Sequence, residues 1–209
     1  MRRLTVDPRA PEADALDEAA ATLRAGGLVA YPTETYYGLA VDVRSGQAVE
    51  ALFAAKGRER EKAIPLVASG LDQLEALGIA LTPAARRLAR EFWPGPLTLV
   101  IPAWPGLAPA VCGQARTAGV RVPGHPVARG LAAAFGYPVA STSANRSGEP
   151  PLADPVGVER AVGASIDLLL DGGPAPGGLA STIVDVSGPV PRLVRLGPIA
   201  WEQVLECLR

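Results

Sequence analysis

The sequence predicts an α/β fold, a twisted open mixed sheet flanked by helices, and three observations lead to this prediction. The 209 residues are 48% hydrophobic and 20% charged, which is enough apolar material for one sizeable core and too little charge for a disordered chain. Short apolar runs interleave with alanine-rich amphipathic stretches, a pattern typical of strands and helices packed in layers. Several runs are joined by turns alone, so the sheet must mix parallel and antiparallel neighbours. Without an internal repeat or a long linker, residues 1–209 are expected to form one domain.

The expected helices have start and stop signals that can be read directly. In residues 46–56, Ser45 can cap the first turn and Gly57 can end the last one. Thr82 and Pro83 open another helix as cap and first-turn residue. These signals and the spacing of apolar residues predict helices over residues 11–24, 46–56, 71–77, 83–92, 127–135, 155–162 and 199–208.

The expected strands are apolar runs that end at glycine, proline or clustered polar residues. They span residues 27–31, 39–43, 63–68, 97–101, 119–122, 137–141, 167–170, 181–186 and 192–196. The last two flank Ser187-Gly188-Pro189 and are expected to pair around that turn. The proline-rich residues 102–113 are expected to be a surface crossing.

Composition excludes several classes of protein. A net charge of -1 and a pI near 5.9 exclude a general nucleic-acid coat, so any RNA contact must be local. Two distant cysteines, Cys112 and Cys207, and a single histidine, His125, argue against a zinc site. No apolar run approaches the roughly 20 residues that cross a bilayer, and no apolar signal core follows the N-terminus. We therefore expect a cytoplasmic protein without a membrane segment.

The usual catalytic motifs are absent from the sequence. There is no G-x-x-x-x-G-K-[ST] phosphate loop, no G-x-G-x-x-G after a strand and no G-x-S-x-G elbow. A serine hydrolase would need a base, and His125 stands between Gly124 and Pro126 at a helix start, where packing explains it better. Any chemistry must therefore rest on positioned charges and hydrogen bonds.

The most informative stretch follows the run at residues 27–31. That run ends at Pro32, which cannot donate to a strand ladder, and hydroxyls and the Glu34 carboxylate crowd the positions before Gly38. A buried strand that ends in such a loop is a usual start of a site in an α/β sheet. The alternative is a polar loop capped by its own hydroxyls, and the stretch alone does not decide between the two.

Two further loops carry polar groups that could bind phosphate. Lys56-Gly57-Arg58 lies at a helix end, and Lys62, the second of only two lysines, follows closely. These cations could bind phosphate, compensate the helix dipole or form a solvated face. Ser141, Ser143 and Asn145 alternate at period two where a strand ends, so their side chains would share one side. They suit a polar ligand or a phosphate, and the alternative is a helix-capping turn.

Arginines and hydroxyls complete the set of candidate residues. Arg121 lies between apolar residues in a strand, and a buried arginine needs an anion or a carboxylate as partner. Ser181-Thr182 and Arg195 lie on the last two strands. Together the segments around Lys56, Arg121, Ser141–Asn145 and Ser181–Arg195 supply cations and hydroxyls but no titrating base. This combination suits a polyphosphate and a small zwitterion, with charge stabilised on a transferring phosphoryl group.

These residues lie in motifs whose order resembles that of the YrdC family, the threonylcarbamoyl-adenylate synthases. The resemblance covers about residues 14–199. It is carried by Tyr-Pro-Thr-Glu-Thr-x-Tyr-Gly-Leu, Lys-Gly-Arg, Trp-Pro-Gly-Pro-Leu-Thr, Val-Arg-Val-Pro-x-His-Pro, Ser-Ala-Asn-x-Ser-Gly, Asp-Gly-Gly, Ser-Thr-Ile-Val-Asp and Arg-x-Gly.

The resemblance implies a large, positively charged concave cleft. It also implies that L-threonine, bicarbonate and ATP become threonylcarbamoyl-adenylate and pyrophosphate, with Mg²⁺ bridging the phosphates. Downstream threonylcarbamoyl-transferase proteins would use the product to modify tRNA, and a local tRNA contact is compatible with this role. No residue would become covalently modified.

The resemblance also assigns roles to individual residues. It implies a threonine site made of Thr33, Arg121, Ser141 and Ser181. It implies an ATP site made of Lys56, Arg58, Lys62, Thr117, Ser143, Asn145 and Arg195. Lys56 and Arg58 would act on the phosphates electrostatically. In the loop after Pro32, Tyr37 would shape the wall of the pocket and Glu34 would orient the loop.

The sequence departs from the family pattern at two places. Lys62 stands where many relatives have asparagine, and Val67-Ala68 replaces a histidine of longer members. The chain resembles the single-domain type. Two alternatives stay open, an RNA-binding module that uses the same basic cleft without catalysis, and a carbamoyl-adenylate transfer domain that acts on another acceptor.

Overall fold

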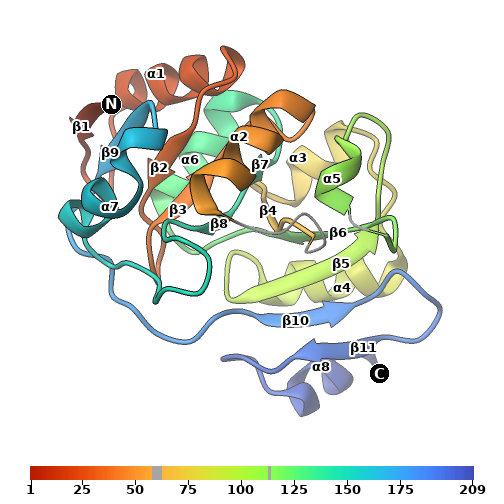
Figure 1. Ribbon diagram of the computed structural model, residues 1–209. Coiled ribbons are helices and arrows are strands. Elements are labelled where there is room, and N and C mark those ends of the chain that lie inside the picture. Colours follow the sequence, from red (N-terminus) through yellow and green to blue (C-terminus); the bar gives the residue numbers. More distant parts are fainter. Residues whose placement is uncertain (58–62, 113) are drawn as a thin grey trace.

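The computed structural model describes residues 1–57, 63–112 and 114–209, and helices surround two sheets in it (Figure 1). The first sheet has five strands in the order β1-β9-β2-β3-β8. Its strands are β1 (Arg2–Thr5), β2 (Val29–Tyr31), β3 (Gly38–Ala40), β8 (Thr142–Ser143) and β9 (Leu168–Asp171). Strand β9 runs parallel to β1 and β2, whereas β3 is antiparallel to both β2 and β8.

The second sheet has six strands in the order β11-β10-β5-β6-β4-β7. They are β4 (Leu66–Val67), β5 (Leu97–Pro102), β6 (Thr117–Arg121), β7 (Val139–Ala140), β10 (Thr182–Asp185) and β11 (Arg192–Arg195). Strands β10 and β11 pair antiparallel, as expected from the turn between them. Parallel and antiparallel pairs mix in both sheets, so the mixed α/β class is confirmed. The strands are divided between two sheets, since β7 and β8 belong to different ones.

The helices begin and end close to the expected residues. They are α1 (Ala13–Arg24), α2 (Gly46–Lys56), α3 (Leu71–Ala76), α4 (Pro83–Phe92), α5 (Pro109–Cys112), α6 (Pro126–Phe135), α7 (Pro155–Val162), the short 3-10 helix η1 (Gly163–Ser165) and α8 (Trp201–Leu208). Ser45 Oγ accepts from the Ala48 amide at 3.2 Å and Thr82 Oγ1 from the Ala85 amide at 3.1 Å. Gly57 ends α2 in the left-handed region at φ 58°.

Two segments differ from the sequence-based expectation. Residues 102–113 are more than a surface crossing, because they contain α5, whose Val111 and Cys112 are buried. The expected strand over 63–68 shrinks to Leu66–Val67, since the Ile64 amide donates to Val111 O at 3.1 Å and Pro65 has no amide hydrogen to pair. Strand β1 was not expected, because its charged residues hide the pairing with β9.

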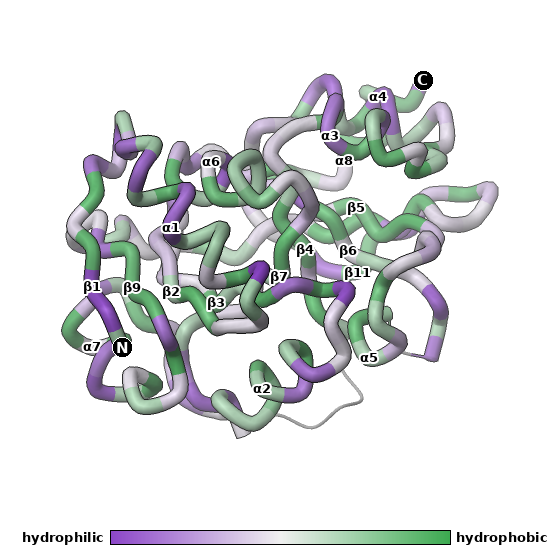
Figure 2. Tube along the Cα trace, turned by 90° about the horizontal axis from the view of Figure 1, so that it is seen from above, coloured by the Kyte–Doolittle hydropathy of each residue, from purple (hydrophilic) through white to green (hydrophobic). Residues whose placement is uncertain are grey.

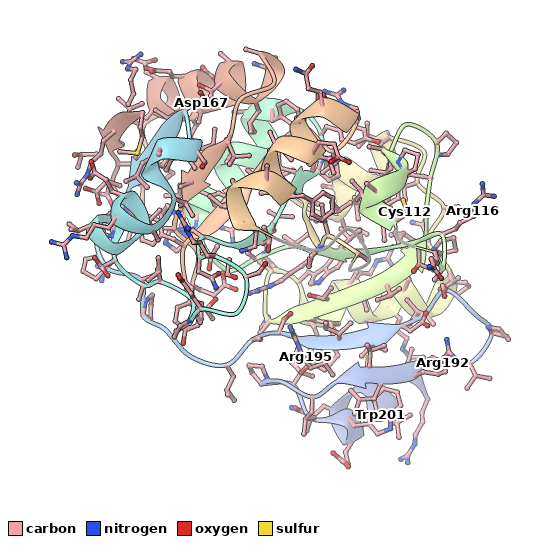
Figure 3. The ribbon with its side chains drawn as sticks, viewed as in Figure 1. Cys112, Arg116, Asp167, Arg192, Arg195 and Trp201 are labelled. Carbon is pink, nitrogen blue, oxygen red and sulfur yellow. The ribbon has the colours of Figure 1, made fainter. Side chains whose placement is uncertain are left out.

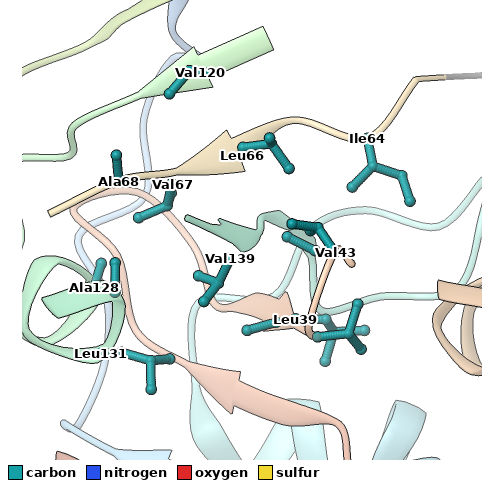
Figure 4. Packing of buried hydrophobic residues seen from close by; sticks show 14 of the residues in the cluster. Leu39, Val43, Ile64, Leu66, Val67, Ala68, Val120, Ala128, Leu131 and Val139 are labelled. Atoms are coloured by element: carbon teal, nitrogen blue, oxygen red, sulfur yellow. The ribbon is translucent and has the colours of Figure 1, made fainter. Parts of the chain in front are cut away.

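The core lies between the sheets and the helices that cover them. Figure 2 shows hydrophobic residues along the inner strands such as β2, β3 and β5, whereas β1 is largely hydrophilic. Side chains from both sheets and from α6 meet in one cluster, of which Leu39, Leu66, Val120, Leu131 and Val139 are labelled in Figure 4. Burial of this apolar surface is the main source of stability for the frame that holds the loops.

The chain passes from the second sheet to the first at Ser141, and the sheets also meet where Asp42, just after β3, bridges Val139 of β7. Strand β7 of the second sheet ends at Ala140 and β8 of the first sheet begins at Thr142. The Ser141 amide donates to Pro65 O at 2.8 Å, which fixes this crossing point. The loops after β2, β6 and β8 therefore come together where the sheets adjoin.

None of the helices in the described part of the chain combines the length and the apolar character that crossing a bilayer would require.

Candidate functional site

A pocket of about 650 Å³ lies at the junction of the two sheets. Six of the predicted threonine and ATP residues line it, and they come from five separate segments of the chain. These six are Thr33, Arg121, Ser141, Ser143, Ser181 and Arg195. Segments far apart in sequence thus build one site, as expected for loops that follow strands in an α/β sheet.

The Thr33 hydroxyl is engaged within its own loop. Its Oγ1 accepts from the amides of Thr35 at 3.2 Å and Tyr36 at 3.3 Å, and donates to Tyr36 O at 2.6 Å. The alternative of a loop capped by its own hydroxyls therefore describes the bonding of Thr33 in this structure. Because Thr33 also lines the pocket, a direct contact with a bound amino acid stays a prediction.

Tyr37 ties the same loop to the first sheet. Its hydroxyl donates to Gly173 O at 2.7 Å and accepts from the Gly172 amide at 3.3 Å. Burial raises the pKa of Tyr37 to about 12, so the phenol stays protonated at neutral pH. A phenol held in this way shapes the wall of the pocket, which agrees with the role expected for Tyr37.

Arg121 is the cation at the end of β6, and its side chain is only 14% exposed. Its Nε donates to Gly95 O at 2.9 Å, and its Nη2 forms an ion pair with Glu34 Oε1. Burial is the main cause that lowers the pKa of Arg121 to about 10, and the charge of Arg195 lowers it further. The side chain still stays cationic at neutral pH. The anion that a buried arginine needs is therefore supplied by Glu34, a partner that sequence reasoning missed.

Arg195 and Ser181 form a second polar group in the pocket. Arg195 reaches back to Ser181 O from both Nε at 3.0 Å and Nη2 at 2.9 Å, and Nη2 also lies 3.2 Å from Ser181 Oγ. Ser181 Oγ lies 2.8 Å from Thr98 Oγ1 on β5. Figure 3 shows Arg195 at the end of β11 opposite Arg192. Thr98 was also missed as a site residue, although it ends the Trp-Pro-Gly-Pro-Leu-Thr motif.

A tight backbone packing fixes the position of Ser181. A Cβ atom at Gly197 would collide with Ala180 O, Thr182 N and Ser181 C, all of them backbone atoms that cannot swing aside. Glycine at this position therefore allows the segment after β11 to lie directly against residues 180–182. The same close approach brings Arg195 within reach of Ser181.

Lys56 is not in the described lining of the pocket, but it contacts Ser143, which is. It is 4% exposed, and its ammonium donates to Ser143 O, to Asn145 O at 2.8 Å and to Asn145 Oδ1 at 3.4 Å. These acceptors, together with the negative end of helix α2, make a buried ammonium tolerable. Lys56 thus holds the Ser143–Asn145 segment in place, whatever it contributes to phosphate binding.

Asn145 likewise organises its own loop. Its Nδ2 donates to Arg146 O at 3.0 Å and to Glu149 O at 2.6 Å, and the residue is buried. The expected alternation brings Ser141 and Ser143 into the lining, but Asn145 is absent from it because β8 ends at Ser143. The loop is a turn that caps a helix end, as the alternative interpretation held, because the Ser147 amide donates to Lys56 O at the end of α2 at 2.8 Å.

Three other predicted ATP residues are not brought into the described lining. Thr117 is the first residue of β6 and pairs with Pro102, so it lies four residues before Arg121, at roughly 3.3 Å per residue along the strand. Arg58 and Lys62 fall outside the described residues. The large positively charged cleft therefore stays a prediction, since Arg121 and Arg195 are the charged side chains of the described lining and Glu34 pairs with the first.

The described residues also bear on metal binding. Within residues 1–57, 63–112 and 114–209, no three or more His, Cys, Asp or Glu side chains gather in one place. The lining offers hydroxyl oxygens but no carboxylate, and carboxylates are the usual protein ligands of Mg²⁺. The described residues therefore do not make a magnesium site by themselves.

Gly95 should be essential for the position of Arg121. Its amide donates to Val122 O at 2.9 Å, its carbonyl accepts from Arg121 Nε, and a Cβ atom there would collide with Phe92 O. We expect Gly95→Ala to lower the free energy of unfolding by about 1–3 kcal/mol and to weaken ligand binding at Arg121, as measured by urea denaturation and titration. Gly124→Ala is the matched control, because nothing lies within 4 Å of its Cβ position. Equal stability of the two variants would contradict this account.

Fold and pocket together define a class of protein. It is an α/β ligand-binding protein whose site lies between two sheets and presents arginines and hydroxyls from strand ends. Such a lining favours a ligand with a carboxylate or phosphate and several hydrogen-bonding groups.

Comparison with known proteins identifies the family. The pattern of the Sua5/YciO/YrdC family, which carries the description "Telomere recombination", matches residues 21–197. A threonylcarbamoyl-AMP synthase of Chromohalobacter salexigens is 43% identical over 176 residues, 83% of this chain and 94% of the relative. The chain belongs to the Sua5/YciO/YrdC family, and the resemblance seen in the sequence motifs is confirmed.

Solved structures agree with this assignment. Pyrococcus abyssi Sua5 complexed with L-threonine superposes with a TM-score of 0.91 and 34% identity, covering 100% of this chain and 61% of that chain. The chain thus spans less than two thirds of that protein. E. coli YciO superposes with a TM-score of 0.85 at 24% identity, covering 98% of this chain and 100% of the other, and supports the fold alone.

Proposed function

We propose that the protein is a threonylcarbamoyl-AMP synthase, which makes threonylcarbamoyl-adenylate and pyrophosphate from L-threonine, bicarbonate and ATP. One observation carries the proposal. The guanidinium of Arg121 is anchored at the wall of a pocket that also contains the hydroxyls of Ser141 and Ser181. A relative that is 43% identical in sequence is named for this activity, and one related structure is described as complexed with L-threonine.

In this proposal the amino acid binds on the side of Arg121. Its carboxylate would pair with the guanidinium, because a planar arginine fork matches a carboxylate. The hydroxyls of Ser141 and Ser181 would bind the remaining polar groups, and Thr33 would border the same space. The Thr98–Ser181 hydrogen bond fixes the Ser181 hydroxyl in advance, which lowers the cost of ordering it on binding.

The nucleotide would occupy the remainder of the site. Ser143 and Arg195 line the pocket, and the loop held by Lys56 and Asn145 forms the adjoining support. Arg58, Lys62 and Thr117 remain predictions for the same ligand. Mg²⁺ would come with the ATP phosphates and would neutralise part of their charge.

Chemistry in this site would depend on charge and position. The amino nitrogen of threonine would first form a bond to the carbon of bicarbonate with loss of water, which gives N-carboxythreonine. Its carbamate oxygen then forms a bond to the α-phosphorus of ATP, and the bond from that phosphorus to the bridging oxygen breaks, so pyrophosphate leaves with the electron pair. Fixed cations can stabilise the charge that builds up on the phosphoryl oxygens. The described lining supplies arginine, serine, threonine and tyrosine side chains, which suit stabilisation of charge better than covalent catalysis.

The product would serve tRNA modification. We propose that threonylcarbamoyl-transferase proteins downstream receive the adenylate, with tRNA contact by this chain limited to a local patch. A net charge of -1 supports such a limit, because broad binding of a polyanion needs a basic surface.

The decisive experiment is product formation by the purified protein. We expect pyrophosphate release only when ATP, L-threonine and bicarbonate are all present, and a product with the mass of threonylcarbamoyl-adenylate. Serine in place of threonine measures selectivity for the methyl group. Tight, salt-dependent RNA binding without ATP turnover would instead favour the RNA-binding module, and no pyrophosphate under any condition would refute the proposal.

A further inference from the structure

Arg121, which lines the pocket, forms an ion pair with Glu34 that its proposed role does not require. Arg121 Nη2 contacts Glu34 Oε1, and the side chains of Arg121 and Glu34 are 14% and 28% exposed. The proposed function assigns the same guanidinium to the carboxylate of L-threonine. A carboxylate of the protein itself therefore pairs with the guanidinium that the substrate carboxylate would need.

The position of Arg121 does not depend on Glu34. Its Nε is held by Gly95 O at 2.9 Å, and its backbone is fixed in β6 by pairing with Val67 and by the Ala68 amide, which donates to Arg121 O at 2.9 Å. The guanidinium would keep its place if the Glu34 carboxylate moved away. This anchoring distinguishes Glu34 from a residue that orients the arginine.

The Glu34 carboxylate, in contrast, is weakly held. Both of its oxygens are buried, and among the described residues neither accepts a hydrogen bond beyond the ion pair with Arg121. A buried carboxylate is normally stabilised by two or three donors. Glu34 is therefore poorly satisfied in its present position, and a stronger anionic ligand on Arg121 could replace it.

Release of Glu34 needs no movement of the backbone. The turn that carries it is closed by the Thr33 hydroxyl, which binds the amides of Thr35 and Tyr36. Rotation of the Glu34 side chain would be enough, since 28% of that side chain is already exposed although its carboxylate oxygens are buried. Rotamer changes of this kind are fast compared with typical enzyme turnover.

We propose that Glu34 is an internal competitor of the amino-acid substrate, bound to Arg121 in the empty pocket and displaced by the carboxylate of L-threonine. This inference rests on the proposed function. Glu34 then sets the affinity for threonine, because the apparent dissociation constant is the intrinsic constant divided by the fraction of molecules with Arg121 free. The pair also satisfies a buried cation whenever the pocket is empty.

The test is the dissociation constant of L-threonine, measured calorimetrically without ATP or bicarbonate. Glu34→Gln keeps the shape of the side chain and removes its charge, and Glu34→Asp keeps the charge on a side chain that is one methylene shorter. We expect threonine to bind about three- to tenfold more tightly to both variants. Glu75→Gln is the matched control, because it breaks a surface ion pair with Arg86 outside the pocket, and it should leave the constant unchanged.

Each other outcome overturns the inference. Unchanged binding to Glu34→Gln and Glu34→Asp would mean that Glu34 does not compete, and weaker binding would make it a positioning residue for Arg121 or for the substrate ammonium. A thermal melt of each variant verifies the fold. The result is separable from the proposed function, since a wild-type protein that binds threonine with an affinity insensitive to Glu34 refutes this inference alone. No threonine binding by any of the proteins would refute both.

Discussion

Replacing Arg121 by alanine is expected to lower kcat/KM for threonine by about a hundredfold, an effect of about 2.7 kcal/mol. The reason is the loss of a charge-assisted, two-point contact between the guanidinium and the substrate carboxylate. Hydrogen bonds between charged groups are stronger than those between neutral groups. The effect should fall on the KM for threonine, while the affinity for ATP measured by titration changes little.

The variant has a side effect that needs its own control. Without Arg121, the Glu34 carboxylate would be buried and unpaired, and the fold itself would lose stability. The double variant Arg121→Ala with Glu34→Gln removes that charge, so it should recover stability but not threonine binding. Arg192→Ala, on an exposed arginine of β11 that pairs with Asp185, is the matched control. Wild-type kinetics in Arg121→Ala would remove the residue from the site.

Replacing Lys56 by alanine is expected to lower activity by about tenfold to a hundredfold and to reduce the free energy of unfolding as well. Loss of a charged donor to a buried acceptor costs roughly 1.5–3 kcal/mol, and here Ser143 O, Asn145 O and Asn145 Oδ1 lose theirs together. The loop that carries Ser143 should loosen, so the effect should appear in the KM for ATP. Steady-state kinetics and urea denaturation of the same preparations measure both quantities.

A second substitution separates charge from volume at this position. Lys56→Met keeps most of the buried stem and removes the ammonium, whereas alanine also leaves a cavity. Equal losses of activity in the two variants would assign the effect to the ammonium. Loss of stability without loss of activity would restrict Lys56 to a structural role.

Local signals in the sequence predicted much of the fold. The caps Ser45 and Thr82 and the stop at Gly57 gave correct helix ends, because each acts through atoms within a few residues. Strand β1 could not be predicted in this way, since its partner β9 lies more than 160 residues further on. Pairing at such a separation leaves no mark in the local pattern of charged residues.

The site follows the same rule. The alternation at Ser141 and Ser143 and the buried position of Arg121 were visible in the sequence, and the structure brings these residues together in one pocket. The partnerships between segments were not visible. Two contacts join loops and strands that are distant in sequence, the ion pair of Glu34 with Arg121 and the hydrogen bond of Thr98 with Ser181. The energy of each contact depends on burial, which exists only in the folded chain.

The meeting of the two sheets at Ser141 has a thermodynamic consequence. A ligand that touches both the Thr33 loop and Ser181 fastens two separate hydrogen-bonded networks to each other, so part of its binding free energy becomes resistance of the whole chain to unfolding. The free energy of unfolding should then rise with substrate concentration, because the substrate binds only the folded chain. Ligand binding in the pocket should therefore add to the stability that the apolar core gives the two sheets.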